Sequence, residues 1–323
     1  MSYKVLRWVL KLFLLAQVVS HVYALEAKKR TSPDQQRKTA QAGYNSAKQK
    51  QQQILRANAA ENNAPAWAGS YYRGNGWDLK VSIALSDEAG VAVTMQGDDG
   101  NYEGSIGSVE LMSNGHLAIR LEHSITGFES SEYVPTRWAG RMYLIKSDDV
   151  ARFASDINLG LEPREDKYGI YPLHEGNEKL AATGLPALPP AAVALIRNKP
   201  LVVRATSVQL IKLQKYQYGC DRFYRIQIDH GSTAGLAKGV LLNSLKERDQ
   251  KRITLTEVRP EQAVAGFEDI LGTCDRPGQV PVRGELFTTG SYPPAHKSKP
   301  DNQQCEKDQS LPAHASSAVH PPH

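Results

Sequence analysis

From Trp67 onward, hydrophobic and polar residues alternate with a period of two, which is the pattern of β-strands. The clearest run is residues 79–85, in which leucine, valine and isoleucine occupy every second position. Turn residues separate this run from those that follow, so the segment predicts an antiparallel meander. The expected strands are residues 79–85, 91–95, 104–111, 116–122 and 141–145.

One helical pattern follows these strands. Ser147, Asp148 and Asp149 are typical of a helix start, and Gly160 is typical of a helix end. Between them the apolar residues recur at helical spacing, so we expect a helix over residues 148–159 that packs on the sheet. The residues on its apolar face are Val150, Phe153, Ala154 and Ile157.

The proline-rich segment 184–190 predicts a boundary between two parts of the chain, and Pro190 is suited to begin a short helix. The fold class that we predict is mainly β. An antiparallel N-terminal sheet domain over residues 65–185, with one packed helix, is followed by a small β-barrel-like domain over residues 190–290. The expected strands of this second domain are residues 201–213, 223–228, 239–245, 253–258 and 280–287.

The two flanking segments have a different composition. Residues 25–64 are rich in Gln, Lys, Ala and Asn, and after Leu25 only Tyr44, Ile54 and Leu55 are large and apolar. Such a segment buries little surface, so we expect a polar, basic stalk that is either a solvated helix or disordered. Residues 291–323 are polar and proline-rich, and we expect a disordered tail.

Residues 1–24 have the order of a secretory signal peptide. Lys4, Arg7 and Lys11 precede an apolar run over residues 12–19, and small residues around Ala24 complete the pattern. We therefore predict cleavage after Ala24 and a periplasmic or secreted protein. The apolar run is shorter than a membrane span, and no second run follows, so no integral membrane segment is expected after the leader is removed.

The distribution of charge argues against a nucleic-acid-binding protein. The chain carries a formal charge of +5, but residues 65–290 hold 25 basic and 28 acidic side chains and are slightly acidic. The excess of basic residues lies in the leader and in residues 25–64. A basic recognition face on the folded part is therefore disfavoured, and the functional alternative for the basic stalk is contact with anionic envelope polymers.

Three cysteines are present, at positions 220, 274 and 305. In an oxidising compartment we predict a disulfide between Cys220 and Cys274, because Cys305 falls in the polar tail. The alternative is that one or more of the thiols stay free. The cysteines lack the spacing of zinc ligands, so no metal site and no cofactor are expected.

Several residues have the types needed for hydrolysis, but their spacing is unfavourable. Asp229, His230 and Ser232 are neighbours in sequence, whereas a nucleophile relay is assembled from distant segments. The acidic loop 97–103 suits a pair of catalytic carboxylates or calcium, yet Asp and Asn beside Gly are also what a hairpin turn requires. We interpret both as turns. The histidines considered for convergence on an acidic residue are His116, His123 and His174, but scattered histidines on strands are more often surface or core residues.

An aromatic cluster is the best candidate for a binding site. Large rings separated by glycines can stack on sugars or hold a peptide when they are exposed. The alternative is that the rings fill the core of the sheet. The candidate binding residues are Trp67, Tyr71, Tyr72, Trp77 and Arg73.

Two resemblances add to this interpretation. Segments 67–76 (WAGSYYRGNG), 137–145 (RWAGRMYLI) and 158–164 (NLGLEPR) resemble uncharacterised secreted proteins of Gram-negative bacteria, a likeness that covers residues 67–288 and implies no activity. Segment 231–240 (GSTAGLAKGV) is similar to the turn and strand that open β-barrel modules of periplasmic rod-shape-determining proteins.

The function that these patterns favour is that of a non-enzymatic exported envelope protein that binds a partner protein or a glycan. The alternative is a secreted hydrolase that acts on cell-wall or polysaccharide substrates. A deep pocket in which acid, base and nucleophile converge would favour the enzyme, and an aromatic patch would favour the binding protein.

Overall fold

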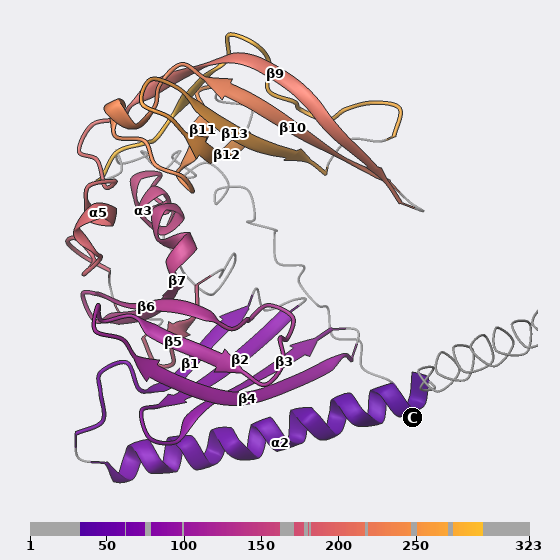
Figure 1. The fold of residues 1–323 in the computed structure, drawn as a ribbon, viewed down its shortest axis with the longest axis vertical. Helices are drawn as coiled ribbons and strands as arrows, with labels where there is room; N and C mark the ends of the chain where they lie inside the picture. The colour runs from indigo at the N-terminus through magenta and orange to yellow at the C-terminus, as the bar shows by residue number, and fades with distance from the viewer. Residues whose placement is uncertain are drawn as a thin grey trace, which may run out of the picture.

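The fold is mainly β, as the alternating pattern predicts, and its strands form two closed antiparallel barrels (Figure 1). The predicted leader 1–24, Trp77 and the tail beyond residue 292 lie outside the described residues. The computed structural model describes residues 33–61, 63–74, 79–98, 100–161, 171–177, 180, 182–216, 219–246, 251–270 and 274–292.

The first barrel is an up-and-down meander in which each strand pairs with the next. It closes because β8 pairs with β1, with Leu173 opposite Tyr72 and His174 opposite Tyr71. Its strands are β1 (Gly69–Gly74), β2 (Leu79–Ser86), β3 (Gly90–Gly97), β4 (Tyr102–Leu111), β5 (Leu117–Leu121), β6 (Ser131–Trp138), β7 (Arg141–Lys146) and β8 (Leu173–His174).

The interior of the first barrel is filled by every second residue of its strands. Val81, Ile83 and Leu85 of β2 are fully buried, and Val91 and Val93 of β3 lie opposite Leu85 and Ile83. The alternation that predicted these strands is thus the alternation of side chains between the barrel interior and its outer surface.

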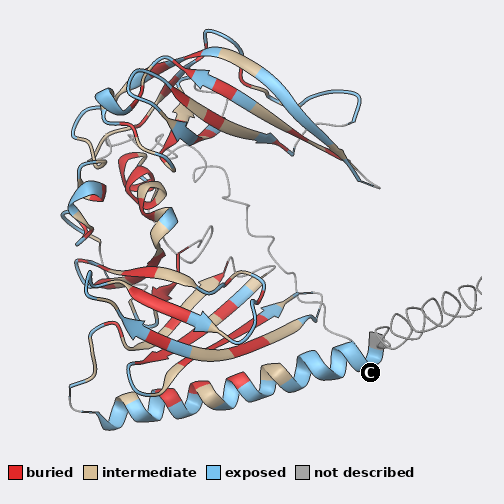
Figure 2. Cartoon of the chain, in the orientation of Figure 1, coloured by how far each residue is buried: buried red, intermediate tan, exposed pale blue. Residues whose placement is uncertain are grey.

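Helix α2 (Pro33–Ala60) replaces the expected stalk, and this part of the prediction needs correction. The segment is helical, but it is not solvated all round, because it runs along the outer face of β2, β3 and β4 (Figures 1 and 2). Ala47 and Ile54 are fully buried, and Gln51 donates from its amide nitrogen to the carbonyl oxygen of Ser82 at 2.8 Å. Ala47, Gln51 and Ile54, at heptad spacing, therefore form a buried face on a segment that was expected to be solvated.

Gly104 makes this close packing possible. A Cβ atom at this position of β4 would lie 2.6 Å from the Cα atom of Tyr44 and 2.9 Å from the Cβ atom of Ala47. The helix backbone thus approaches the strand more closely than any other residue would permit.

Helix α3 (Val150–Asn158) is the predicted amphipathic helix, and a 3-10 turn, η1 (Ser147–Asp149), precedes it. Phe153 lies fully buried among the rings of Trp138, Tyr143 and Tyr171. The opposite side of α3 faces the second barrel, where Ser155 Oγ accepts a hydrogen bond from the backbone N–H of Leu241 at 3.1 Å. The helix therefore packs on both barrels rather than on one sheet alone.

The second barrel has a non-sequential strand order, β10-β13-β12-β11-β14-β9, and all of its pairs are antiparallel. Beside the barrels lie the short helix α5 (Pro190–Val193), which begins at proline as predicted, and η2 (Ser232–Ala234). The strands are β9 (Val202–Lys215), β10 (Cys220–Ile228), β11 (Leu241–Ser244), β12 (Arg252–Val258), β13 (Ala263–Asp269) and β14 (Leu286–Thr288).

The predicted disulfide between Cys220 and Cys274 is present, with the two Cα atoms 5.0 Å apart. It joins the first residue of β10 to the segment after β13. Arg222 supports the same end of the barrel, because its guanidinium donates to the carbonyl oxygen of Cys274 at 2.9 Å and lies 3.7 Å from Asp269.

Among the helices of the described residues, none combines the length and apolar character that crossing a membrane requires.

Candidate functional site

Two of the predicted aromatic binding residues belong to the core. Trp67 is 6% exposed and Tyr71 is fully buried, and the Tyr71 hydroxyl donates to the carbonyl oxygen of Trp67 at 2.8 Å. The ring of Tyr71 also packs edge-on against His174. The alternative of core packing therefore holds for these two residues, because their side chains point into the interior of the first barrel.

Tyr72 and Arg73 differ from them in position. Both are half-buried, and they lie on opposite faces of β1 because neighbouring side chains alternate along a strand. Arg73 shares the inward face with Tyr71 and lies near the end of the strand, at the mouth of the first barrel. The sequence-predicted set is thus not brought together as one surface, and Arg73 is the member that reaches a cavity.

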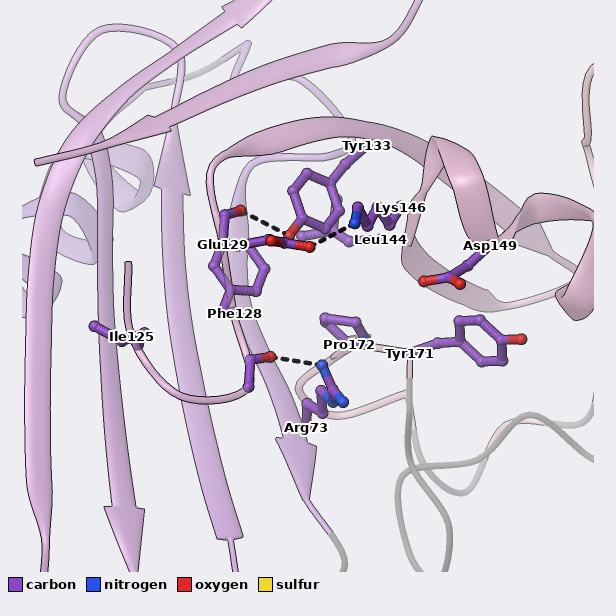
Figure 3. A pocket seen from close by; sticks show the side chains of 11 residues that line it. Arg73, Ile125, Phe128, Glu129, Tyr133, Leu144, Lys146, Asp149, Tyr171 and Pro172 are labelled. Carbon is purple, nitrogen blue, oxygen red and sulfur yellow. Dashed lines mark hydrogen bonds and ion pairs between the residues drawn. The ribbon is translucent and has the colours of Figure 1, made fainter. Parts of the chain in front are cut away.

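This cavity, the barrel-mouth cavity, has a volume of about 280 Å³ (Figure 3). Its side chains come from β1, the loop between β5 and β6, β6, β7, η1 and the residues before β8, and they surround a common space. The lining residues are Arg73, Ile125, Gly127, Phe128, Glu129, Tyr133, Leu144, Lys146, Asp149, Tyr171 and Pro172.

Arg73 provides a fixed positive charge at the cavity wall. One guanidinium nitrogen donates to the carbonyl oxygen of Gly127 at 2.5 Å, which anchors the side chain to the loop between β5 and β6 (Figure 3). Burial lowers the pKa of Arg73, whereas the nearby Tyr133 and Asp149 act in the opposite direction. An arginine remains charged under all ordinary conditions, so its other N–H groups are donors for a ligand.

A second pair of charges lies across the cavity. Lys146 Nζ contacts the Glu129 carboxylate at 2.5 Å, and the hydroxyl of Tyr133 donates to the Glu129 carbonyl oxygen at 2.9 Å. Burial raises the pKa of Tyr133, so its phenol stays protonated at neutral pH. The carboxylate of Asp149 is half-buried on the same wall and makes no capping hydrogen bond to α3.

Behind the cavity, Tyr171 connects the site to α3. Its hydroxyl donates to Asp156 Oδ2 at 3.0 Å, and both groups are buried. Burial raises the pKa of Asp156, while the hydrogen bond from Tyr171 and the charge of Arg152 oppose that rise. Tyr171 is thereby held in one orientation beside the cavity.

The residues considered for hydrolysis lie elsewhere, in the turns that the sequence predicts. His230 Nδ1 and Asp229 Oδ1 are 2.7 Å apart, but the backbone N–H of Ser232 donates to the carbonyl oxygen of Arg259 at the start of η2. In the loop 97–103, the backbone N–H of Gly97 donates to the carbonyl oxygen of Asn101, as a hairpin turn requires; Asp99 is outside the described residues.

The histidines do not converge on one site. His116 lies 3.6 Å from Glu132, His123 is hydrogen-bonded to the carbonyl oxygen of Gly104, and His174 packs on Tyr71. Within the described ranges, no group of three or more His, Cys, Asp or Glu residues is arranged to hold a metal ion.

Most of the residues of the barrel-mouth cavity were not recognised in the sequence. Glu129 and Lys146 are 17 positions apart and meet only because β6 and β7 fold against each other. The sequence pattern places Asp149 only at the start of a helix, and no pattern in the sequence marks Tyr171 as a site residue. Of the lining residues, Arg73 was the one that the sequence analysis selected, because it belongs to the aromatic cluster.

Comparisons of the chain with protein-family models, with curated proteins and with solved structures gave no match. No activity is therefore carried over from a relative, and the function proposed below rests on the residues of this chain.

Proposed function

We propose that this protein is an exported, non-enzymatic envelope protein that binds a glycan, and that one sugar residue enters the barrel-mouth cavity. The observation that carries the proposal is the mixture of groups on the cavity wall. Arg73 and Lys146 donate, Glu129 and Asp149 accept, and aromatic rings lie between them. Export, with cleavage after Ala24, is part of the proposal.

Sugars suit such a wall because each hydroxyl group both donates and accepts hydrogen bonds, while the C–H faces of the ring pack on aromatic side chains. The size agrees as well. Cavities for drug-sized ligands are roughly 300 Å³ or larger, so a cavity of about 280 Å³ suits a single ring rather than a long chain. The rest of the glycan would extend into solvent.

Binding is favoured over hydrolysis by the chemistry of the lining. The lining residues include no serine or cysteine, and the raised pKa of Tyr133 makes its phenol a hydrogen-bond donor rather than a nucleophile. Glu129 is engaged by Lys146. Glycoside hydrolysis uses a pair of carboxyl groups, and the pairing of Glu129 with Lys146 leaves Asp149 without a second free carboxylate among the described residues of the cavity wall.

The test is a binding measurement with two variants of the cavity. The purified protein is titrated with soluble peptidoglycan fragments and with oligosaccharides cut from bacterial surface polysaccharides, first on an array and then by calorimetry. Arg73→Gln and Asp149→Asn should each weaken binding of the selected oligosaccharide by roughly tenfold, since each removes a charged hydrogen-bonding group. Asp149→Asn keeps the shape of the side chain and removes no capping hydrogen bond, so it guards against a folding artefact.

Arg137→Gln serves as the matched control, because Arg137 is exposed on β6 and does not line the cavity. It should bind like the unaltered protein. Absence of binding to every probe, or equal losses in the control and cavity variants, would contradict the proposal. Release of shorter oligosaccharides during the titration would favour the hydrolase instead.

A further inference from the structure

The second barrel carries an edge that the cavity does not involve. Strand β9 is 14 residues long, and it pairs with β14 only through residues 202–204. From residue 206 to residue 215, its described pairing partners all belong to β10, on one side. The other side of this part of β9, here called the β9 edge, therefore has no backbone pairing partner among the described residues.

The β9 edge is also apolar. Leu210 is 48% exposed, Ile211 is 60% exposed and Leu213 is 41% exposed, which is unusual for three large aliphatic side chains in one strand. In Figure 2 the long ribbon of β9 and β10 extends beyond the rest of the second barrel, with exposed residues along β9. A long apolar edge of this kind is a template for pairing with another strand.

The register of β9 and β10 sorts the side chains of the edge onto two faces. On one face Leu210 lies opposite Tyr224 and Leu213 lies opposite Arg222, and Tyr224 also contacts the ring of Phe267. The other face holds Lys212, whose Nζ atom lies 5.2 Å from the centre of the Phe223 ring. One face thus presents Leu210 and Leu213 and ends at Lys215, opposite Cys220, and the other face carries the positive charge of Lys212.

The charges decide which strand fits. Lys212 and Lys215 are exposed on the edge, and β9 contains no acidic residue. A second copy of the same edge would bring lysines toward lysines, and lysine on an edge strand is a recognised device against self-pairing. A strand with acidic residues gains the same backbone hydrogen bonds without that repulsion.

We infer that the β9 edge binds an extended segment of a partner protein in which apolar and acidic residues alternate. The apolar side chains of that segment would pack beside Leu210 and Leu213, and its acidic side chains would lie near Lys212. Main-chain hydrogen bonds would supply the affinity and the alternation would supply the specificity, as in other cases of strand addition. This inference does not depend on the glycan site.

The experiment uses three short probes and the full chain. The first probe is a fluorescent nine-residue peptide in which Val and Glu alternate, the second has Lys in place of Glu, and the third is the Glu peptide with alternate backbone nitrogens methylated. Fluorescence anisotropy should show binding of the Glu peptide, with the Lys peptide weaker by about tenfold or more. The methylated peptide should not bind, because it cannot form the ladder of hydrogen bonds.

A charge-reversed variant makes the test decisive. Lys212→Glu combined with Lys215→Glu changes only exposed side chains, and it should exchange the preference so that the Lys peptide binds more tightly. Lys199→Glu combined with Lys238→Glu, two exposed lysines away from β9, should keep the original preference. The inference is overturned by no binding of the Glu peptide, by equal binding of the methylated peptide, by an unchanged preference in the reversed variant, or by self-association through the β9 edge.

Discussion

Among single residues, Glu285 holds the most consequential buried charge of the second barrel. Its carboxylate accepts from Lys251 at 2.9 Å and from the hydroxyl of Ser244 at 2.8 Å, and it also accepts from the backbone N–H of Val282. Burial by itself would raise the pKa of Glu285, but these hydrogen bonds outweigh it and lower the pKa below its ordinary value of 4.5. The folded state thus stabilises the ionised form.

We predict that Glu285→Gln lowers the free energy of unfolding by about 3–5 kcal/mol at neutral pH, because Lys251 is left as a buried, uncompensated charge. A group whose pKa is lowered by folding adds stability above its unfolded pKa and loses it as the pH falls through the folded value. The difference in melting temperature between the variant and the unaltered protein should therefore shrink as the pH drops below about 4.

Glu257→Gln is the control for this prediction. Glu257 pairs with Arg225 on the surface, where both side chains are about half-exposed, so its loss should cost less than about 1 kcal/mol. A difference for Glu285→Gln that stays constant from neutral to acid pH would show that the ionised carboxylate is not what the barrel stabilises.

At the residue level, the sequence predicted burial better than it predicted the site. The disulfide and the apolar face of α3 follow from composition and periodicity, which are local signals. The barrel-mouth cavity follows from which strand ends meet, and neither Glu129 nor Tyr171 has a neighbour in sequence that marks its role. Trp67 and Tyr71 show the limit of the aromatic signal, since large rings serve a core as readily as a binding surface.

Among the elements, α2 depends most on one contact that the sequence did not reveal. Its docked face combines small and polar residues with Ile54, so the usual measure of amphipathicity is weak, and its place is set by the absence of a side chain at Gly104. The hydrogen bond from Asn58 Nδ2 to the carbonyl oxygen of Leu85, at 2.8 Å, fixes the far end of the helix. The composition of this segment therefore does not distinguish a solvated stalk from a helix that packs on the barrel.

We predict that Gly104→Val displaces α2 and costs about 1–3 kcal/mol, because the new side chain would overlap the backbone of Gly43 and Tyr44. Trypsin should then cleave faster after the exposed residues Lys48 and Arg56 of α2. Gly219→Val provides the comparison, because a Cβ atom there has no neighbour within 4 Å. If α2 in Gly104→Val resists trypsin as well as in the comparison variant, the packing described here is wrong.

For the whole molecule, the disulfide stabilises the second barrel by closing a long stretch of chain. Cys220 and Cys274 are 54 positions apart, and the chain between them includes most of β10 and all of β11, β12 and β13. By the chain-entropy relation, a loop of this length corresponds to about 4 kcal/mol. An oxidising compartment, which the leader predicts, would allow this bond to form.

We predict that replacing both Cys220 and Cys274 by Ala lowers the free energy of unfolding by about 2–5 kcal/mol, as measured by urea denaturation. Dithiothreitol should lower the stability of the unaltered protein by a similar amount and leave the double variant unchanged. Equal sensitivity of both proteins to the reductant would mean that this bond does not provide the stabilisation.

The mainly β fold and most of its antiparallel strands could be predicted because alternation is a local pattern. Strands β6 and β13 were not predicted, and the strand expected over residues 280–287 begins only at Leu286. The closure of each barrel could not, because it depends on pairs such as Tyr72 with Leu173 that are about a hundred residues apart. The same is true of the packing of α3. One side of this helix contacts the first barrel and the other side contacts the second, so its environment depends on both.

The central claim is that the barrel-mouth cavity binds a sugar, and hydrogen–deuterium exchange with a bound oligosaccharide tests it most directly. The protein is saturated with the tightest oligosaccharide found in the binding measurement, and amide exchange is compared with and without it. We expect slower exchange in residues 125–129 and 171–174, which form the loop and strand end at the cavity, and no change along β9. Protection confined to β9 or to α2, with residues 125–129 and 171–174 unchanged, would contradict the account.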